Sequence, residues 1–362
     1  MTTIDCARLC LHGCSFLGDL RLGLVTTHLS RAVGSRRFTV QQLSGDSRSG
    51  VTVTVRPCPV CGRQTARLLY RPAAAPGPVS ECCGCSMVYV AEVTDNRALI
   101  VEGPVVPEGV DPRILTSSNL DDVRNSWEFE LLPLKEAEWP AVRRNAAHAL
   151  RRLDKHARLG PSDRRILDFG SAWGFFLAVA KEHGWEAYGL EPLPASAVYA
   201  RAKFGVTVKA DTLREDTFPA QFFDAITAFQ VFEHLPNPAG DLALLRRMLR
   251  NGGILLIEVP NIRTWSVRVL RSRHRHFVQD HLNFFSAETL RRLLTETGFE
   301  VVDEYCPTRR MTVRYLIECW AARCLPALVP VLRSIAKRAG AWDRVVAINI
   351  GDIVAVIARK LE

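Results

Sequence analysis

The stretch Arg165-Ile-Leu-Asp-Phe-Gly-Ser-Ala-Trp-Gly-Phe-Phe-Leu177 decides the fold, because it predicts a buried strand, a glycine-rich turn and the start of a helix. The apolar residues before Asp168 are typical of the strand. Gly170 and Gly174 allow a tight turn and let the backbone approach a ligand. The helix is expected over residues 175–183, and Gly184 is expected to end it. A turn of this kind also occurs where no ligand binds, so it indicates a nucleotide site only together with its surroundings.

The residues after this helix strengthen the interpretation. A second strand is expected over residues 187–190, and Glu191 follows at its carboxyl end. An acid in that position can accept hydrogen bonds from the two hydroxyls of a ribose. A dinucleotide-binding motif fits less well. Started on Gly170, the pattern G-x-G-x-x-G requires glycine at the positions of Ala172 and Phe175.

The segment Asp168-Phe-Gly-Ser-Ala-Trp-Gly174 resembles the first motif, D-x-G-x-G-x-G, of class I S-adenosylmethionine-dependent methyltransferases. The resemblance implies S-adenosylmethionine as cofactor. The chain departs from the motif at Ala172, which adds one methyl group beside the expected methionine end of the cofactor. The resemblance assigns cofactor binding to Asp168, Gly170, Ala172, Gly174 and Glu191.

Strands and helices continue to alternate after the opening motif. Strands are expected over residues 206–208, 222–229 and 254–260, and helices over 195–204 and 242–249 are expected before the first and the last of them. This alternation predicts an α/β fold with a doubly wound parallel sheet. Asp211, Gln230 and the pair Glu233-His234 follow strand ends, so they are expected at the ligand-binding edge of that sheet. Asp211 is a candidate partner for the adenine amino group, and Gln230 completes the expected cofactor set.

Three further segments look like the methyltransferase family often labelled type 23. They are Phe223–Pro238, Gly252–Leu255 and Asp280–Ser286, and the resemblance covers residues 140–304 with a last strand over 352–358. It implies a seven-stranded, mostly parallel Rossmann-like sheet whose last strand is antiparallel. Together with the cysteine pairs described below, the chain is also similar to sugar C-methyltransferases, whose further C-terminal domain has no counterpart here.

Methyl transfer to a hydroxyl or an enolisable carbon requires removal of a proton, and histidine is the natural base near neutral pH. His234 is the first candidate, with Glu233 expected to orient or stabilise it. The alternative is that the pair only shapes its loop. His281 is the second candidate, and its alternative is a packing role ahead of a helix capped by Ser286.

Two C-x-x-C pairs predict a structural zinc site. Cys58 and Cys61 form the first pair, Cys82 and Cys85 the second, and together they offer the four thiolates that Zn²⁺ prefers. Strands expected over 66–70 and 87–90 make a small zinc ribbon over residues 51–95. The methyltransferase domain is expected over 96–362, with a helical insertion at about 305–345. Residues 1–50 are expected to be an extension, and the spacing of Cys6, Cys10, His12 and Cys14 fits no known metal motif.

Composition limits the function classes. The net charge of +9 favours an anionic partner but does not distinguish nucleic acid, phosphorylated small molecules and an anionic membrane surface. Clustered cysteines in a long chain favour a reducing, cytoplasmic setting over a disulfide scaffold. The leading hypothesis is a methyltransferase for a small-molecule acceptor, anionic or phosphate-bearing, such as a nucleotide- or lipid-linked sugar. The alternatives are an RNA methyltransferase that holds nucleic acid with its ribbon, and a non-catalytic S-adenosylmethionine-binding protein.

Two segments after the fifth strand each have more than one interpretation. The basic stretch 263–276 suits a phosphate through bidentate arginine contacts, or is a solvated loop. Residues 311–340 are apolar and basic. Because two prolines interrupt this segment, it is not expected to span a membrane. It is interpreted as a lid, a dimer surface or an interfacial helix that contacts a membrane peripherally.

Overall fold

The structure is a computed structural model, and it describes residues 54–93, 112–122, 132–157, 164–321 and 325–362. The expected extension over 1–50, with its three cysteines and His12, lies outside these ranges, as do residues 96–111 and 123–131 of the expected methyltransferase domain. Among the helices within the ranges, none has the length and hydropathy that crossing a membrane requires.

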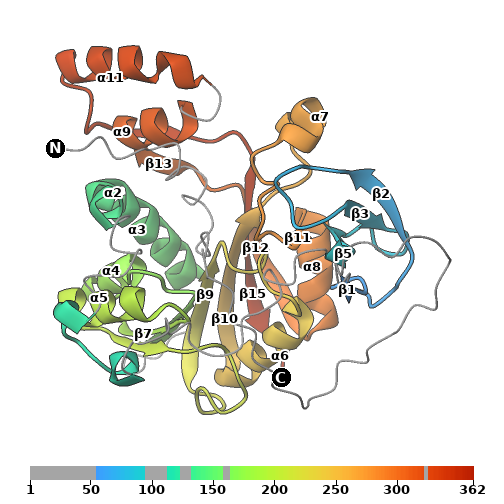
Figure 1. Ribbon diagram of the computed structural model, residues 1–362. Coiled ribbons are helices and arrows are strands. Elements are labelled where there is room, and N and C mark those ends of the chain that lie inside the picture. Colours follow the sequence, from blue (N-terminus) through green and yellow to red (C-terminus); the bar gives the residue numbers. More distant parts are fainter. Residues whose placement is uncertain (1–53, 94–111, 123–131, 158–163, 322–324) are drawn as a thin grey trace.

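A seven-stranded sheet forms the centre of the molecule (Figure 1), in the spatial order β12-β15-β10-β9-β6-β7-β8. Strands β6 to β10 are mutually parallel, whereas β15 is antiparallel to both of its neighbours. The predicted doubly wound, mostly parallel sheet is therefore confirmed. The strands are β6 (Arg165–Phe169), β7 (Glu186–Glu191), β8 (Thr207–Ala210), β9 (Phe223–Phe229), β10 (Leu249–Pro260), β12 (Phe299–Tyr305) and β15 (Ile353–Lys360).

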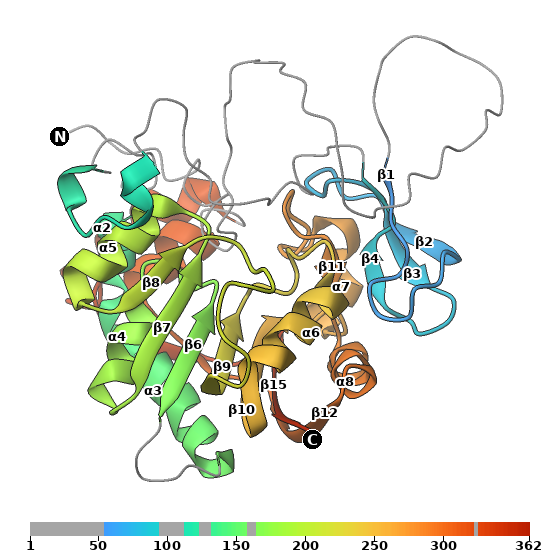
Figure 2. The ribbon, with the colours of Figure 1, turned by 90° about the horizontal axis from the view of Figure 1, so that it is seen from below.

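Helices cover both faces of this sheet, and successive strand residues point to opposite faces. Ile166 packs with α3 (Trp139–His156), α4 (Phe175–Glu182) and α5 (Pro194–Phe204). Its neighbour Leu167 belongs to the core on the other face, with α6 (Pro238–Met248) and α8 (Ala287–Glu296). Figure 2 shows the two groups of helices on either side of the strands. Short helices α2 (Leu132–Ala137), η2 (Pro112–Leu115) and η3 (Leu120–Asp122) lie beside the first group.

The structure differs from the expected boundaries at α6 and at β10. Helix α6 begins at Pro238, earlier than predicted, because the Asn237 side chain accepts a hydrogen bond from Gly240 N. Strand β10 already begins at Leu249. Residues 249–253 thus lie within the strand, which was expected to begin at 254, and its pairing with β9 is irregular between Leu249 and Ile254. Ser286 caps α8 as expected, and Thr289 completes a capping box.

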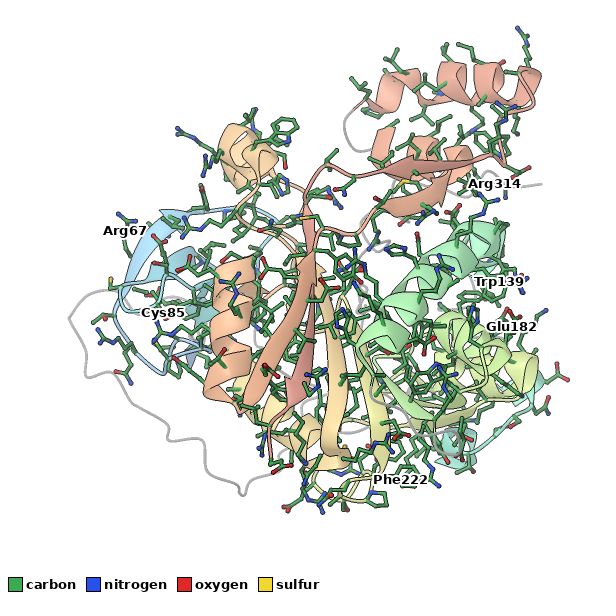
Figure 3. All side chains as sticks on the ribbon, turned by 180° about the vertical axis from the view of Figure 1, so that it is seen from behind. Arg67, Cys85, Trp139, Glu182, Phe222 and Arg314 are labelled. Carbon is green, nitrogen blue, oxygen red and sulfur yellow. The ribbon has the colours of Figure 1, made fainter. Side chains whose placement is uncertain are left out.

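The cysteine-rich region forms a four-stranded sheet in the order β11-β4-β3-β2. Three strands are β2 (Ala66–Tyr70), β3 (Val79–Cys82) and β4 (Val88–Val90), and the fourth is β11 (Asn283–Phe284) from the far end of the chain. The short strands β1 (Thr54–Val55) and β5 (Glu92–Val93) pair beside it. The sequence predicted β2 and β4 but not β3 or the contribution of β11. Cys85 lies beside α8, and both belong to one core (Figure 3).

Two smaller units follow β10 and β12. Helix α7 (Trp265–Leu270) and the turn η5 (Arg271–Arg273) come after β10. After β12, strands β13 (Arg309–Thr312) and β14 (Val345–Ile348) form an antiparallel stem. The stem carries α9 (Val313–Tyr315), the π-helical η6 (Leu316–Ala321), η7 (Pro326–Leu328) and α11 (Val329–Arg338). We call residues 309–348 the helical arm.

Candidate active site and cysteine cluster

A cavity of about 350 Å³ opens at the carboxyl ends of β7, β8 and β9. Four of the seven residues predicted to bind a cofactor line it, namely Gly170, Glu191, Asp211 and Gln230. Asp168, Ala172 and Gly174 do not line it. The remaining walls are mostly apolar and come from the strand ends, the loop before α6 and the start of α6. They consist of Phe169, Leu190, Pro192, Thr212, Leu213, Phe229, Val231, His234, Leu235, Pro236, Asn237 and Asp241.

The glycine-rich turn owes its shape to two glycines with different tasks. Gly170 has a φ of +78°, and a Cβ there would lie 2.5 Å from Cγ2 of Val231 in the cavity wall. Gly174 has a φ of +73°, but a Cβ there would lie 2.6 Å from the Cβ of Ala200 in α5. Gly174 therefore allows the turn to pack closely against α5. Ala172 also adopts a left-handed conformation, with a φ of +50°.

Two buried acids lie beside this turn, and Glu191 braces it. Glu191 Oε2 accepts a hydrogen bond of 2.8 Å from Ala172 N, and Glu191 Oε1 accepts one of 3.0 Å from Leu193 N. Burial raises the pKa of Glu191 to about 7, although the two backbone hydrogen bonds lower it. Asp168 accepts a hydrogen bond of 2.7 Å from Thr227 Oγ1, and burial raises its pKa to about 8. Of the two acids, only Glu191 borders the cavity, whereas Asp168 connects β6 to Thr227 of β9.

Asp211 and Gln230 lie on either side of the cavity. The Asp211 carboxylate accepts hydrogen bonds of 2.6 and 2.5 Å from the Arg214 guanidinium. Gln230 follows β9 with a left-handed φ of +56°, and its backbone N–H donates to the carbonyl of Glu258 at 2.8 Å. A non-glycine residue in this conformation costs about 1–2 kcal/mol, and such strain occurs often at functional sites.

His234 is the candidate base that borders the cavity. Its Nδ1 lies 3.0 Å from the carbonyl oxygen of Asp280 and 3.4 Å from Oδ2 of the same residue. In the neutral tautomer that these acceptors favour, Nδ1 carries the proton and Nε2 has the free lone pair. Nε2 has no hydrogen-bond partner among the residues that the structure describes. Asp280 thus orients the ring, and the unpaired Nε2 is itself buried.

Glu233 and His281 surround this imidazole. The His234 and His281 rings meet edge to face with centroids 4.8 Å apart. One ligand atom from each of Glu233, His234 and His281 lies within 4.8 Å of the others, which is also close enough for a divalent cation. Glu233 and His281 are almost completely buried and do not line the cavity. The structure therefore brings the three predicted catalytic residues together, with His234 at the front.

Four residues of this region were not found from the sequence. Asp280 orients His234, and Asp241 lines the cavity, where burial raises its pKa to about 6. Buried Asn283 donates from Nδ2 to the carbonyls of Phe232 and Leu235, at 3.0 and 2.7 Å. Asp280 and Asn283 flank His281 in the segment Asp280-His-Leu-Asn283. This position beside a candidate base is the sequence signal that could have identified them.

The fourth is Arg56, which connects the cysteine-rich sheet to the loop of His234. Its Nη1 donates to the carbonyls of Val90 and Leu282, at 3.1 and 3.2 Å. Its Nη2 donates to the Pro236 carbonyl and to Asn283 Oδ1, both at 3.1 Å. Burial lowers the pKa of Arg56 to about 10. A sequence cannot reveal this role, because the partners lie 34 to 227 positions away.

The four predicted zinc ligands converge. Cys58 and Cys85 have sulfur atoms 3.4 Å apart, those of Cys61 and Cys82 are 3.5 Å apart, and all four lie within 4.8 Å of one another. Gly84 N donates to the Cys82 sulfur at 3.3 Å, and Gly62 N donates to the Cys58 carbonyl at 2.9 Å. Four thiols on two tight turns fit a tetrahedral Zn²⁺ ion.

Comparisons with known proteins agree with this architecture. Residues 142–304 match the protein family described as "Methyltransferase domain", which is less than half of the chain. A Mycolicibacterium smegmatis protein named "Probable S-adenosylmethionine-dependent methyltransferase" is 30% identical over 141 residues, which are 39% of this chain and 53% of that protein. A "Ubiquinone biosynthesis O-methyltransferase" of Histophilus somni is 23% identical over 127 residues, 32% of this chain and 53% of that protein. The chain thus spans about half the length of these curated relatives.

Among solved structures, a SAM-dependent methyltransferase from Archaeoglobus fulgidus matches with 19% identity and a TM-score of 0.38. The match covers 60% of this chain and 94% of that one. The family match thus makes residues 142–304 similar to a methyltransferase domain.

Proposed function

We propose that the protein is an S-adenosylmethionine-dependent methyltransferase for a small acceptor that must lose a proton. The observation that carries the proposal is His234, which borders the cavity with Nε2 unpaired among the described residues and Nδ1 held by Asp280. The family match and the curated relatives support methyl transfer, and the cavity at the strand ends supports a nucleoside cofactor.

The cavity residues fit S-adenosylmethionine. Glu191 at the end of β7 is placed to accept hydrogen bonds from the ribose, and Asp211 after β8 to accept one from the adenine amino group. Leu190, Pro192 and Phe229 give the apolar surface that a purine requires. Asp168, Gly170, Ala172, Gly174 and Gln230 shape the turn and the end of β9 around it. When bound, the cofactor supplies an electrophilic methyl group on a sulfonium and leaves as a neutral thioether.

The side chains around His234 then have distinct roles. Nε2 takes the proton from the acceptor oxygen or carbon as the new bond to the methyl group forms. The Asp280 carbonyl keeps the Nδ1 proton in place throughout. The carboxylate of Glu233 stabilises the imidazolium that results, and His281 packs edge to face against its ring. The acceptor class that we propose is a nucleotide- or lipid-linked sugar, and the four cysteines hold a structural Zn²⁺ that is remote from the chemistry.

His234→Ala tests the assignment of the base. Since general-base catalysis contributes about 10²–10⁴-fold, we expect at least a 100-fold loss of turnover and nearly unchanged cofactor affinity by calorimetric titration. His183→Ala is the control, because His183 is exposed and does not line the cavity. Weakened cofactor binding with normal turnover would remove His234 as the base.

The acceptor is tested by transfer from methyl-labelled cofactor to nucleotide sugars, lipid-linked sugars and RNA in parallel. Label in a sugar fraction is the expected result. Label in RNA alone would replace the small acceptor by nucleic acid, and cofactor binding without any transfer would favour a binding protein. Metal analysis of a variant that lacks the four cysteines distinguishes zinc at the ribbon from a cation at Glu233, His234 and His281. We expect this variant to contain no bound metal.

A further inference from the structure

Helix α7 presents an apolar tip to solvent. Trp265, Val269 and Leu270 are 65%, 69% and 49% exposed. Scattered apolar residues are common on protein surfaces, but three large ones on a six-residue helix are not. Arg268, Arg271 and Arg273 are exposed beside them and form no ion pair within the part of the chain that the structure describes. This surface therefore combines an aromatic, apolar centre with unneutralised positive charge.

A buried polar network fixes the base of this tip. Ser266 Oγ lies 2.8 Å from Thr264 Oγ1 and 3.0 Å from His274 Nε2. His276 Nε2 lies 3.1 Å from the carbonyl oxygen of Asp352, whose carboxylate pairs with Arg275. Much of the basic stretch that the sequence suggested for phosphate binding is thus an internal support. Its remaining arginines surround the exposed tip.

The helical arm presents a second apolar surface. Leu328, Val331 and Ile335 are 47%, 55% and 59% exposed, and their spacing of three and four residues puts them on one side of the helix. The opposite side is anchored, because Val329 and Ala336 pack on Ile317 and because Arg333 forms a two-fold ion pair with Glu318 at 2.7 and 2.9 Å. Exposed Lys337 and Arg338 follow the stripe. The arm has its own small core, and yet leaves this stripe uncovered.

Both surfaces lie at the edge of the sheet that holds the cavity. Strands β10 and β12 are each antiparallel to β15 and hence run in the same direction, and α7 and the helical arm follow their carboxyl ends. Figures 1 and 3 show α7 and α11 projecting beyond the sheet on this same side, separated from each other across it. A flat surface that touches both tips would therefore face the edge where the acceptor must enter.

We propose that α7 and α11 dock this edge of the enzyme onto an anionic phospholipid bilayer. Exposed tryptophan and aliphatic side chains next to arginine and lysine suit the interface between acyl chains and phosphates. A second copy of the chain fits less well, because a two-fold contact would bring the same arginines together. The inference rests on the proposed function, and it specifies the acceptor as an amphiphile whose polar head is presented at the membrane plane.

Vesicle sedimentation of the full-length protein tests the proposal. We expect binding to phosphatidylcholine vesicles with 30% phosphatidylglycerol, little binding to pure phosphatidylcholine, and weakening by salt. Val269→Ser with Leu270→Ser, and separately Val331→Ser with Ile335→Ser, should each reduce partitioning at least ten-fold. Leu68→Ser, which removes an exposed leucine of the cysteine-rich sheet, is the matched control. Brominated lipids should quench wild-type fluorescence more than that of Trp265→Phe.

The outcomes separate this inference from the proposed function. Cofactor titration reports on the methyltransferase site whether or not vesicles are bound. Equal sedimentation of the wild type and both double variants, each with normal cofactor affinity, would overturn membrane docking alone. A dimer in analytical ultracentrifugation that the same variants dissociate would assign the surfaces to a second copy and would also overturn it.

Discussion

Gly170 and Gly184 have nearly the same backbone conformation in different surroundings, which isolates the role of the cavity glycine. Their φ values are +78° and +81°, and a Cβ at Gly184 would meet nothing within 4 Å. Gly184→Ala therefore adds only backbone strain of about 1–2 kcal/mol. Gly170→Ala adds the contact with Val231, and overpacking of this kind costs about a further 1–3 kcal/mol. We expect this difference in the free energy of unfolding measured with denaturant.

The same pair should differ in cofactor binding. Val231 lines the cavity, so its displacement in Gly170→Ala should weaken S-adenosylmethionine binding in calorimetric titration, whereas Gly184→Ala should leave binding unchanged. Equal stability and equal affinity of the two variants would show that the close approach of Gly170 to Val231 has no importance for the site.

At the scale of secondary structure, the sequence predicted the elements whose signal is local. The strand, turn and helix around Gly170 and the alternation that follows give the central sheet, because apolar periodicity and capping residues act over a few positions. Strand β3 was missed, and it has only four residues. The pairing of β11 with β4 was missed as well, since partners 194 and 196 positions apart leave no periodic signal. For the same reason, Asp280 could not be recognised as the residue that orients His234.

The cysteine-rich sheet is the element whose stability should depend on metal. Its strands are short, so binding of Zn²⁺ would supply much of the folding free energy. The double variant Cys61→Ser, Cys85→Ser should lose zinc in elemental analysis and become protease-sensitive within residues 54–93. Cys83→Ser is the control, because Cys83 is exposed and outside the cluster of four. Full retention of zinc by the double variant would contradict the proposed site.

At the scale of the whole molecule, the cysteine-rich sheet and the methyltransferase domain share one core. Cys58, Cys85 and Tyr89 belong to the same buried cluster as Phe232 and Leu290. Arg56 then connects the two parts through four hydrogen bonds. A shared core predicts that both parts unfold together, so the ribbon would hold the His234 loop in place as part of the enzyme and not as an independent binding module.

Arg56→Met tests this coupling. It removes the four hydrogen bonds that the charged guanidinium donates. Hydrogen bonds to charged groups contribute about 1.5–3 kcal/mol each, so the free energy of unfolding should fall by at least ~3 kcal/mol. Turnover should fall with it, because Pro236 and Asn283 lose their hold on the loop. Arg67→Met is the matched control, since Arg67 belongs to β2 of the cysteine-rich sheet, its side chain is 73% exposed, and its ion pair among the described residues is with Glu81. Calorimetry of the wild type should give one transition. Two separate transitions, or equal effects of the two variants, would mean that the ribbon and the methyltransferase domain fold independently and that the His234 loop is positioned without Arg56.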